Sequence, residues 1–494
     1  MKKIIISLLV VLLISPLLIS CTRPDPDDNI PKELEYTQIA QQTQSTPVAA
    51  GETVPLVVDA EIGQANYLKM EVTSDVNLTG YIKMHSTSDN TDVSQDQFFI
   101  PMDSEEPFKH ILDYYSYLES ADKTIAEITF TNVSSAAGSF TVTDVSVALR
   151  DLPQDMEEKQ VYIGGGGLEL GVSLANGGAV NSLKKTSGRL VQARDTETGI
   201  MSVGENYDKL PGRELASTSV NLLNRHDAGR LVQQSYYGYT SGTNDTLYQS
   251  GTFMGNKWPY NPVQGGNQEN RLSKLVDFEL TETSLYIKCI PADWAIFESN
   301  PPTEKYLSKS YMENWYSFED GMVKVCNRFT DFSGLPHTLR EQELPAFYGI
   351  APLGRFTTYS GNSPYTGAPL SKWDDLSFWS GGGIKLTNVK ENWVAWVNTD
   401  DFGVGLYVPN VETVLAGRYM MGSDEALKFD GDASKTNATT YAAMLGRFKL
   451  RSYDSFEYSY YLSVDYVFRM RDEFNRLSET ITNPKILEYE NRTA

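Results

Sequence analysis

The chain has 494 residues with 64 acidic against 42 basic side chains, which gives a net charge of −22 at pH 7. A protein this acidic lacks the basic surface that neutralises phosphate groups, so its composition argues against a nucleic-acid partner and against a broadly positive groove for polyanions. The length exceeds that of one ordinary domain, and we expect two.

Residues 1–20 have the pattern of a secretory signal peptide. Two lysines precede a short apolar run, which is interrupted by Ser15 and Pro16 and therefore does not predict a transmembrane helix. Cys21 follows directly, and the sequence Leu-Ile-Ser-Cys resembles the bacterial lipoprotein box. The resemblance implies that Cys21 is lipidated and that the protein contacts the membrane only through this lipid. The alternative is ordinary secretion with a chance cysteine.

Residues 21–50 are polar and contain few apolar side chains. Such a composition cannot bury a core, so we expect a flexible tether. The stretch after the cysteine, TRPDPDDN, is similar to the acidic tag of surface-exposed lipoproteins in Bacteroidota. The similarity implies a protein anchored to the outer membrane, on its surface or periplasmic face, with partners in a polysaccharide-uptake system.

Residues 51–152 carry short runs of alternating or β-branched residues, among them YLKMEVTS, LTGYIKMHS and SFTVTDVSVALRD. Turn-forming residues separate these runs. Several short strands at regular spacing predict an antiparallel β-sandwich, a jelly-roll-like accessory domain. The polar segment DLPQDMEEKQ, residues 151–160, marks the domain boundary.

Residues 153–494 are expected to form a large antiparallel β domain with few helices, so the fold class of the chain is all-β. The runs joined by TETS and by EDG predict β-hairpins. One amphipathic helix is expected at residues 467–477, because Val467, Met470, Phe474 and Leu477 fall on one face.

Glycines and cysteines of the second domain have simple structural explanations. The four glycines at 164–167 are not followed by the Lys-Ser/Thr of a phosphate loop, so we expect a bend or a strand edge. Cys289 and Cys326 lie in strand-like runs, and they either form a disulfide or remain buried free thiols. Their spacing relative to the four histidines predicts no metal site.

The stretch LELGVSLANGGAVNSLKK, residues 168–185, resembles the start of the galactose-mutarotase-like supersandwich. The stretches EQELPAFY, GNSPYTG, ENWVAW and GVGLYVP look like motifs of polysaccharide-degradation proteins of Bacteroidota. These resemblances imply a β-supersandwich domain that acts on carbohydrate. Mutarotases use a histidine acid and a glutamate base, and no segment here matches well enough to transfer either role.

The segment NRHDAGRLVQQSYYG, residues 224–238, concentrates polar and aromatic side chains of the kind that bind sugars. As a strand, it would place Arg230, Gln234 and Tyr236 on one face, which we predict to bind substrate. His226 and Asp227 precede the strand in a turn and are candidate catalytic residues.

A second group of candidate substrate-binding residues lies in loops rich in Trp, Asn, Gln and Gly. Sugar rings stack on aromatic planes, and their hydroxyls bond to amides and carboxylates. The predicted residues are Trp258, Tyr260, Asn261, Gln264, Asn267, Glu269, Trp373 and Trp379. Packing of the same aromatics at a domain edge is the structural alternative.

Three functions remain open. A glycoside hydrolase needs two carboxyl groups across the scissile bond, and we predict Glu343 and Glu391 as acid and base because both lie next to apolar residues. A polysaccharide lyase would instead use His226, Arg230, Gln234 and Tyr236. A non-catalytic glycan-binding lipoprotein would need the aromatics alone. No cofactor is expected; Asp-Gly-Asp at 430–432 suggests a calcium loop, but its spacing is not that of an EF-hand.

Overall fold

A computed structural model provides the structure of the chain. It describes residues 35–56, 58, 60–63, 67–86, 92–100, 102, 108–113, 123–148, 160–186, 193–194, 201–202, 220–238, 251–253, 256–258, 260–295, 306–331, 333, 337–374, 376–378, 382–420, 432–450, 455–484 and 486. Among these residues no helix is both long and apolar enough to cross a membrane. The predicted signal peptide and Cys21 lie outside the described residues.

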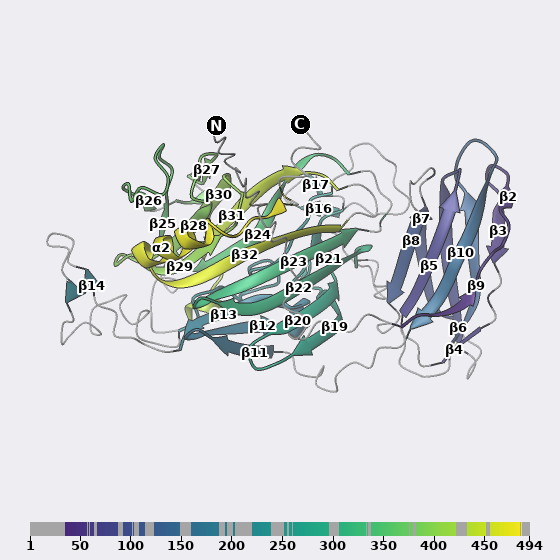
Figure 1. Cartoon of the computed structure of the whole chain (residues 1–494), viewed down its shortest axis with the longest axis horizontal. Coiled ribbons are helices and arrows are strands. Elements are labelled where there is room, and N and C mark those ends of the chain that lie inside the picture. Colours follow the sequence, from purple (N-terminus) through teal and green to yellow (C-terminus); the bar gives the residue numbers. More distant parts are fainter. Residues whose placement is uncertain are drawn as a thin grey trace, which may run out of the picture.

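The described strands confirm the all-β fold class, and Figure 1 shows the first ten strands apart from the later ones. Two antiparallel sheets form the N-terminal sandwich. One consists of β1 (Thr37–Ala40), β10 (Gly138–Ala148), β5 (Tyr67–Ser74) and β8 (Phe108–Asp113), with β2 (Thr46–Val48) paired to β10. The other consists of β3 (Thr53–Leu56), β9 (Lys123–Asn132), β6 (Leu78–Ser86) and β7 (Asp92–Ile100), with β4 (Ala60–Gly63) paired to β9.

Alternation of apolar side chains explains this sandwich. Leu68, Met70 and Val72 of β5 are all buried, and they pack with Ile128 and Phe130 of β9 in one core. The prediction of a flexible tether does not hold from Thr37 onward. Strands β1 and β2 pair with β10, because their few apolar residues add to this core.

The larger domain contains a nine-stranded and a four-stranded antiparallel sheet. The nine-stranded sheet runs in the order β19 (Lys274–Leu280), β20 (Leu285–Ile290), β22 (Ser310–Glu319), β23 (Met322–Asp331), β32 (Ser455–Tyr466), β29 (Phe402–Tyr407), β28 (Trp393–Val397), β25 (Arg355–Thr358) and β26 (Ser371–Asp374). The four-stranded sheet consists of β24 (Arg340–Ile350), β31 (Thr439–Phe448), β30 (Val414–Tyr419) and β27 (Ile384–Leu386).

Shorter strands complete this domain. They are β11 (Gln160–Gly165), β12 (Leu168–Ser173), β13 (Ala179–Lys185), β14 (Ala193–Arg194), β15 (Met201–Ser202), β16 (Gly251–Phe253), β17 (Asn256–Trp258), β18 (Pro262–Val263) and β21 (Ala292–Asp293). Both predicted hairpins are confirmed, as β19–β20 and β22–β23. Gly166 and Gly167 adopt positive φ in the turn between β11 and β12, which confirms the bend expected for the glycine run.

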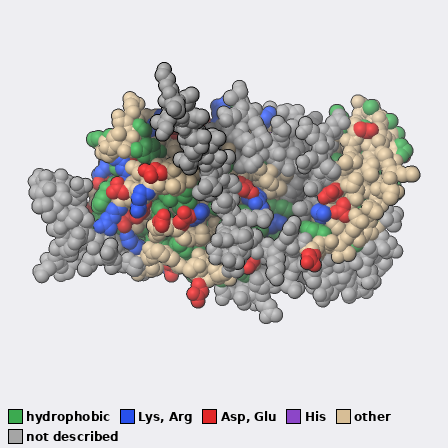
Figure 2. All heavy atoms as spheres, viewed as in Figure 1, with side chains coloured by type: hydrophobic (Ala, Val, Ile, Leu, Met, Phe, Trp, Pro, Cys, Tyr) green, Lys and Arg blue, Asp and Glu red, His purple; other side chains and the backbone are tan. Residues whose placement is uncertain are grey.

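The helix α2 (Val467–Leu477) has the predicted bounds. All four residues of its predicted apolar face are buried, and they pack against Trp393 and Tyr407 of the nine-stranded sheet. Arg471 is buried on the same helix. Cys289 and Cys326 are buried thiols that form no disulfide, which agrees with the second of the two alternatives for these cysteines. Figure 2 shows acidic and basic side chains interspersed on one face of the larger domain, without a broad basic patch there.

Candidate functional site

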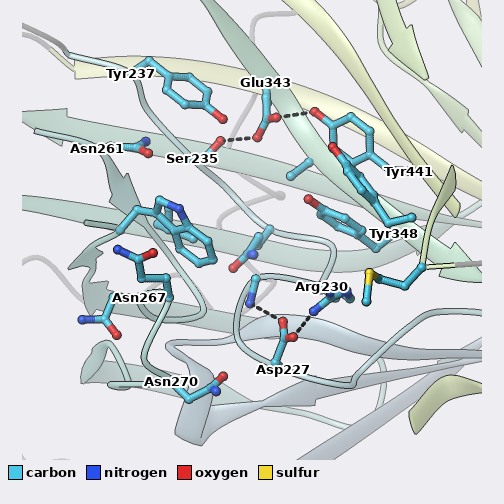
Figure 3. A pocket seen from close by; sticks show the side chains of 18 residues that line it. Asp227, Arg230, Ser235, Tyr237, Asn261, Asn267, Asn270, Glu343, Tyr348 and Tyr441 are labelled. Carbon is cyan, nitrogen blue, oxygen red and sulfur yellow. Dashed lines mark hydrogen bonds and ion pairs between the residues drawn. The ribbon is translucent and has the colours of Figure 1, made fainter. Parts of the chain in front are cut away.

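One cavity of about 420 Å³ opens in the larger domain (Figure 3). Its lining mixes carboxyl, amide, hydroxyl and aromatic groups. The lining residues are Asp227, Gly229, Arg230, Gln233, Ser235, Tyr237, Asn261, Val263, Asn267, Gln268, Asn270, Trp294, Glu343, Ala346, Tyr348, Tyr419, Met420 and Tyr441. Several segments distant in sequence, including strands of the four-stranded sheet, therefore contribute to one site.

Residues 230–238 form one wall of the cavity. This segment is extended but makes only isolated bridges, Gln233 to Ala346 of β24 and Ser235 to Val263 of β18 among them. The side chains alternate from Gln233 to Tyr237, but the face predicted to bind substrate is reversed there: Gln233, Ser235 and Tyr237 line the cavity. Arg230, which was predicted on the other face, lines the cavity as well.

Gln234 and Tyr236, which were predicted to face the substrate, make their contacts within the core. Gln234 donates to the Glu313 carbonyl and to Asn314 Oδ1, at 2.9 and 3.0 Å. The Tyr236 ring stacks on Phe329, and its hydroxyl lies 2.8 Å from His337 Nδ1. The prediction that Gln234 and Tyr236 contact substrate is therefore corrected.

Glu343 projects from β24 into the cavity and is half-buried. The Ser235 hydroxyl donates to its Oε2 at 2.7 Å, and the Tyr441 hydroxyl donates to its Oε1. Burial raises the pKa of Glu343, while hydrogen bonds from Tyr441, Ser235 and Tyr237 act in the opposite direction. The carboxyl thus keeps its proton to a higher pH than an ordinary glutamate does.

Asp227 and Arg230 form an ion pair on another wall of the cavity, away from Glu343 (Figure 3). A tight turn positions the carboxylate, because the Gly229 N–H donates to Asp227 Oδ1 at 3.0 Å. The hydroxyl of Tyr348 interacts electrostatically with both Glu343 and Asp227. Burial is the largest cause of its raised pKa, and the charges of Glu343 and Asp227 act in the same direction.

Trp294 is the one tryptophan of the lining, and it contacts the turn that carries Asp227. A Cβ atom added at Gly229 would lie 2.6 Å from Trp294 Cη2, so the ring packs directly against the glycine. Nearby, Asn270 Oδ1 accepts a hydrogen bond from the Ala228 N–H at 3.0 Å. These contacts join the 224–238 and 260–295 segments into one wall.

Glu391 does not lie at the cavity. It is 0% exposed, and Arg471 donates to both of its carboxylate oxygens, at 2.7 and 2.8 Å. Trp393 Nε1 and the Tyr365 N–H donate to the same group, at 3.0 and 2.9 Å. The predicted pairing of Glu343 with Glu391 is therefore corrected. The apolar residues next to Glu391 in the sequence belong to the core, where Glu391 forms an ion pair with Arg471 of α2.

Of the other predicted site residues, Asn261 and Asn267 line the cavity. Tyr260 and Gln264 are fully buried, with Tyr260 bonded to Asp331 and Gln264 bonded to Asn314. They support the wall from behind rather than line it, because both side chains are used by the core.

Of the remaining predicted residues, His226, Glu269 and Trp373 are not among the residues that line the cavity. His226 and Glu269 are exposed. The ring of His226 meets the Lys435 carbonyl at 2.9 Å. Trp373 is half-buried and packs on Phe356. Trp258 ends β17, and Trp379 lies outside the described residues.

None of the five aromatic residues in the cavity lining was predicted from the sequence. Tyr348 and Tyr441 face each other in the register of β24 and β31, with ring centroids 4.9 Å apart. Tyr237 lies on the strand face that was not predicted to bind substrate, and Trp294 follows a two-residue strand. The alternation around Tyr237 contained the signal for that residue. The pairing of Tyr348 with Tyr441 depends on strand order, which no local pattern reveals.

Within the described residues, no group of three or more His, Cys, Asp or Glu side chains could hold a metal ion. Asp432, the last residue of the considered calcium loop, instead binds Arg225 and caps the 3-10 helix at Ala433–Lys435. The other two residues of that loop lie outside the described residues.

No family model and no curated protein matches the sequence. Among solved structures, the chain is similar to a putative aldose 1-epimerase from Escherichia coli K12, at 10% identity and a TM-score of 0.31, over 62% of this chain and 99% of that one. It is also similar to a galactose mutarotase related enzyme from Lactobacillus acidophilus, at 9% identity and a TM-score of 0.35, over 62% and 97% of the two chains.

A family 29 carbohydrate-binding module matches 24% of this chain over 84% of its own length, at 10% identity and a TM-score of 0.16. Identities and TM-scores this low carry no argument about activity, so the function is argued from the cavity itself.

Proposed function

We propose that the cavity binds one sugar residue of a carbohydrate and that the protein hydrolyses its glycosidic bond. The observation that carries this proposal is the presence of two different carboxyl groups on one cavity. Glu343 is half-buried with a raised pKa, and Asp227 is ion-paired with Arg230. Carboxyl groups whose environments differ in this way supply the acid and the base of glycoside hydrolysis.

The lining supports a sugar ligand. Amide side chains of Asn261, Asn267 and Asn270 offer donors and acceptors for hydroxyl groups. The Trp294 ring and the tyrosines around Glu343 offer aromatic faces for the C–H side of a sugar ring. A mostly preformed cavity with a few polar groups aimed inward is the usual form of a small-ligand site.

In the proposed reaction, Glu343 donates its proton to the glycosidic oxygen as that bond breaks. Asp227 accepts a proton from the water that adds to the anomeric carbon, and Arg230 holds Asp227 in position. Desolvation of Glu343 supports its role as the acid, because a general acid must stay protonated near the working pH.

One observation favours a second function, glycan binding without catalysis. Both oxygens of Glu343 already accept hydrogen bonds, from Ser235 and Tyr441. A carboxyl group restrained in this way would also serve as a fixed acceptor for a sugar hydroxyl. The lyase alternative loses both candidates for its base, because the Tyr236 hydroxyl is bonded within the core and His226 is not among the lining residues.

A glycoside screen separates hydrolysis from binding. Wild-type protein, Glu343→Gln and Glu341→Gln would be incubated with 4-nitrophenyl glycosides and neutral polysaccharides, and new reducing ends would be measured. Glu341 lies on the same strand but pairs with Lys385 outside the cavity, so its variant is a matched control. We expect Glu343→Gln to lose about 10²–10⁴-fold in rate and Glu341→Gln to match wild type. Equal rates in all three would contradict the role of Glu343.

The proposal extends to location. We propose that Cys21 carries a lipid that anchors the protein to the outer membrane, where its partners would belong to a polysaccharide-uptake system. The support is the sequence Leu-Ile-Ser-Cys at residues 18–21, which follows two lysines and an apolar run within residues 1–17. In cell fractionation, Cys21→Ala is expected to move the protein out of the membrane fraction. A variant that stays there would contradict the anchor.

A further inference from the structure

Asp293 lies behind the cavity wall that carries Asn261 and Trp294. It ends β21, which pairs with β18, and it is 0% exposed. Its Oδ2 accepts a hydrogen bond from the Asn261 N–H at 2.8 Å, and its Oδ1 accepts one from the Ala295 N–H at 3.4 Å. A single carboxyl group therefore restrains the backbone at both Asn261 and Ala295.

The backbone around Trp294 depends on the same arrangement. The Trp294 N–H donates to the Asn261 carbonyl at 2.8 Å, and the Trp294 carbonyl accepts from the Gln268 N–H at 3.2 Å. The ring then reaches Gly229, beside the turn of Asp227. A shift of the segment held by Asp293 would thus move the aromatic face and an amide of the site together.

The contacts require a carboxylate at this position. Two N–H groups point at its two oxygens, so an asparagine would place an NH₂ group against one of the two donors. Protonation weakens the same contacts, because hydrogen bonds to an ionised acceptor are roughly twice as strong as neutral ones. Within the described part of the chain, no charged or titratable side chain contributes to the pKa of Asp293.

We propose that Asp293 is a positioning residue of the sugar site: its carboxylate orders Asn261 and Trp294, and loss of its proton raises the affinity for sugar. The inference rests on the sugar-binding part of the proposed function. It does not depend on whether the bound sugar is hydrolysed.

The expected pH dependence has opposite signs for stability and for binding. Burial raises the pKa of Asp293 to about 7, and the two backbone hydrogen bonds act in the opposite direction. Because the folded state holds this proton more tightly than the unfolded state, the contribution of Asp293 to the free energy of unfolding decreases as the pH rises from the ordinary pKa of 3.8 to about 7. Affinity for sugar is expected to increase around pH 7, where Asp293 loses its proton in the folded state. A carboxyl group with a merely structural role would not raise the affinity for sugar at the pH where it lowers the free energy of unfolding.

Acrylamide quenching of Trp294 tests the ordering without any sugar. The Trp294 signal is the difference between the full-length protein and its Trp294→Phe variant, recorded across neutral pH. Recording it in a Glu343→Gln background removes Glu343, a carboxyl group of the cavity lining whose pKa is also raised. Quenching is expected to fall with rising pH around a midpoint near 7. Asp293→Asn should lack this transition, and the control Glu341→Gln, whose carboxylate pairs with Lys385 outside the cavity, should keep it.

Calorimetric titration with methyl glycosides of glucose, galactose and mannose tests the consequence for binding. The dissociation constant of the best binder is expected to fall about tenfold from acid to alkaline pH in wild type, and to stay flat in Asp293→Asn. Binding that does not change with pH in wild type, or a Trp294 transition that persists in Asp293→Asn, would overturn the inference and leave the proposed function intact. Failure of every glycoside to bind at any pH would overturn both. If Asp293→Asn does not fold, the wild-type profiles alone decide.

Discussion

Replacement of Arg471 by methionine is predicted to destabilise the larger domain strongly while sparing the cavity. Arg471 and Glu391 have side chains that are 9% and 0% exposed, and two hydrogen bonds of 2.7 and 2.8 Å join them. Without the guanidinium, the Glu391 carboxylate would stay buried with only the Tyr365 N–H and Trp393 Nε1 as donors. Removing one partner of a buried ion pair costs about 3–5 kcal/mol, and we expect a loss of that size here.

Urea unfolding at pH 7 measures this loss. The matched control is Lys390→Met, which removes a partner of the neighbouring ion pair with Glu412, where the side chains are 46% and 44% exposed. Exposed pairs contribute about 0–1 kcal/mol, so the control should be nearly neutral. The double variant Glu391→Gln/Arg471→Met should lose less than the sum of its single variants, because the two residues are in contact. A loss for Arg471→Met no larger than for Lys390→Met would refute the assignment of Glu391 to the core.

Three further predictions concern the cavity and the thiols. Gly229→Ala should displace the Trp294 ring, since the new Cβ would lie 2.6 Å from it, and weaken binding of the best methyl glycoside about tenfold in calorimetry; unchanged affinity would contradict the contact. The hydrolysis rate should fall as the pH rises through the raised pKa of Glu343, because the acid must be protonated to donate, and a rate that rises instead would exclude this role. Burial raises the pKa of the Cys289 thiol, and Cys326 is buried as well, so neither should react with a disulfide reagent until urea unfolds the domain; two fast-reacting thiols in native protein would contradict their burial.

Local patterns predicted the elements whose partners are close in sequence. The helix at residues 467–477 follows from apolar spacing alone, and the two hairpins follow from strand runs joined by short turns. The tether contains few apolar residues, but it is not unstructured up to residue 50. Thr46 and Val48 pair with a strand about ninety positions later. Pairing over such a distance depends on the finished sandwich, which composition does not report.

The site was predicted in part, for a related reason. Asp227, Arg230, Asn261, Asn267 and Glu343 do line one cavity. A period of two divides a strand into two faces, but it does not say which face meets the core when both are polar and aromatic.

Glu391 shows the same limit for a single side chain. An apolar neighbourhood in sequence fits a desolvated catalytic acid and a core ion pair equally well. Only the position of Arg471, 80 residues away in the chain, separates the two. Long-range partners, rather than local context, therefore decided the outcome for this carboxyl group.

A crystal structure of the Glu343→Gln variant with the tightest-binding methyl glycoside would test the central claim most directly. The proposal predicts a sugar ring in the cavity, with its hydroxyls on Asn261 and Asn267, its apolar face on Trp294, and its anomeric carbon between residue 343 and Asp227. A ring bound elsewhere, or a ring in the cavity whose anomeric carbon faces away from both acidic positions, would contradict it.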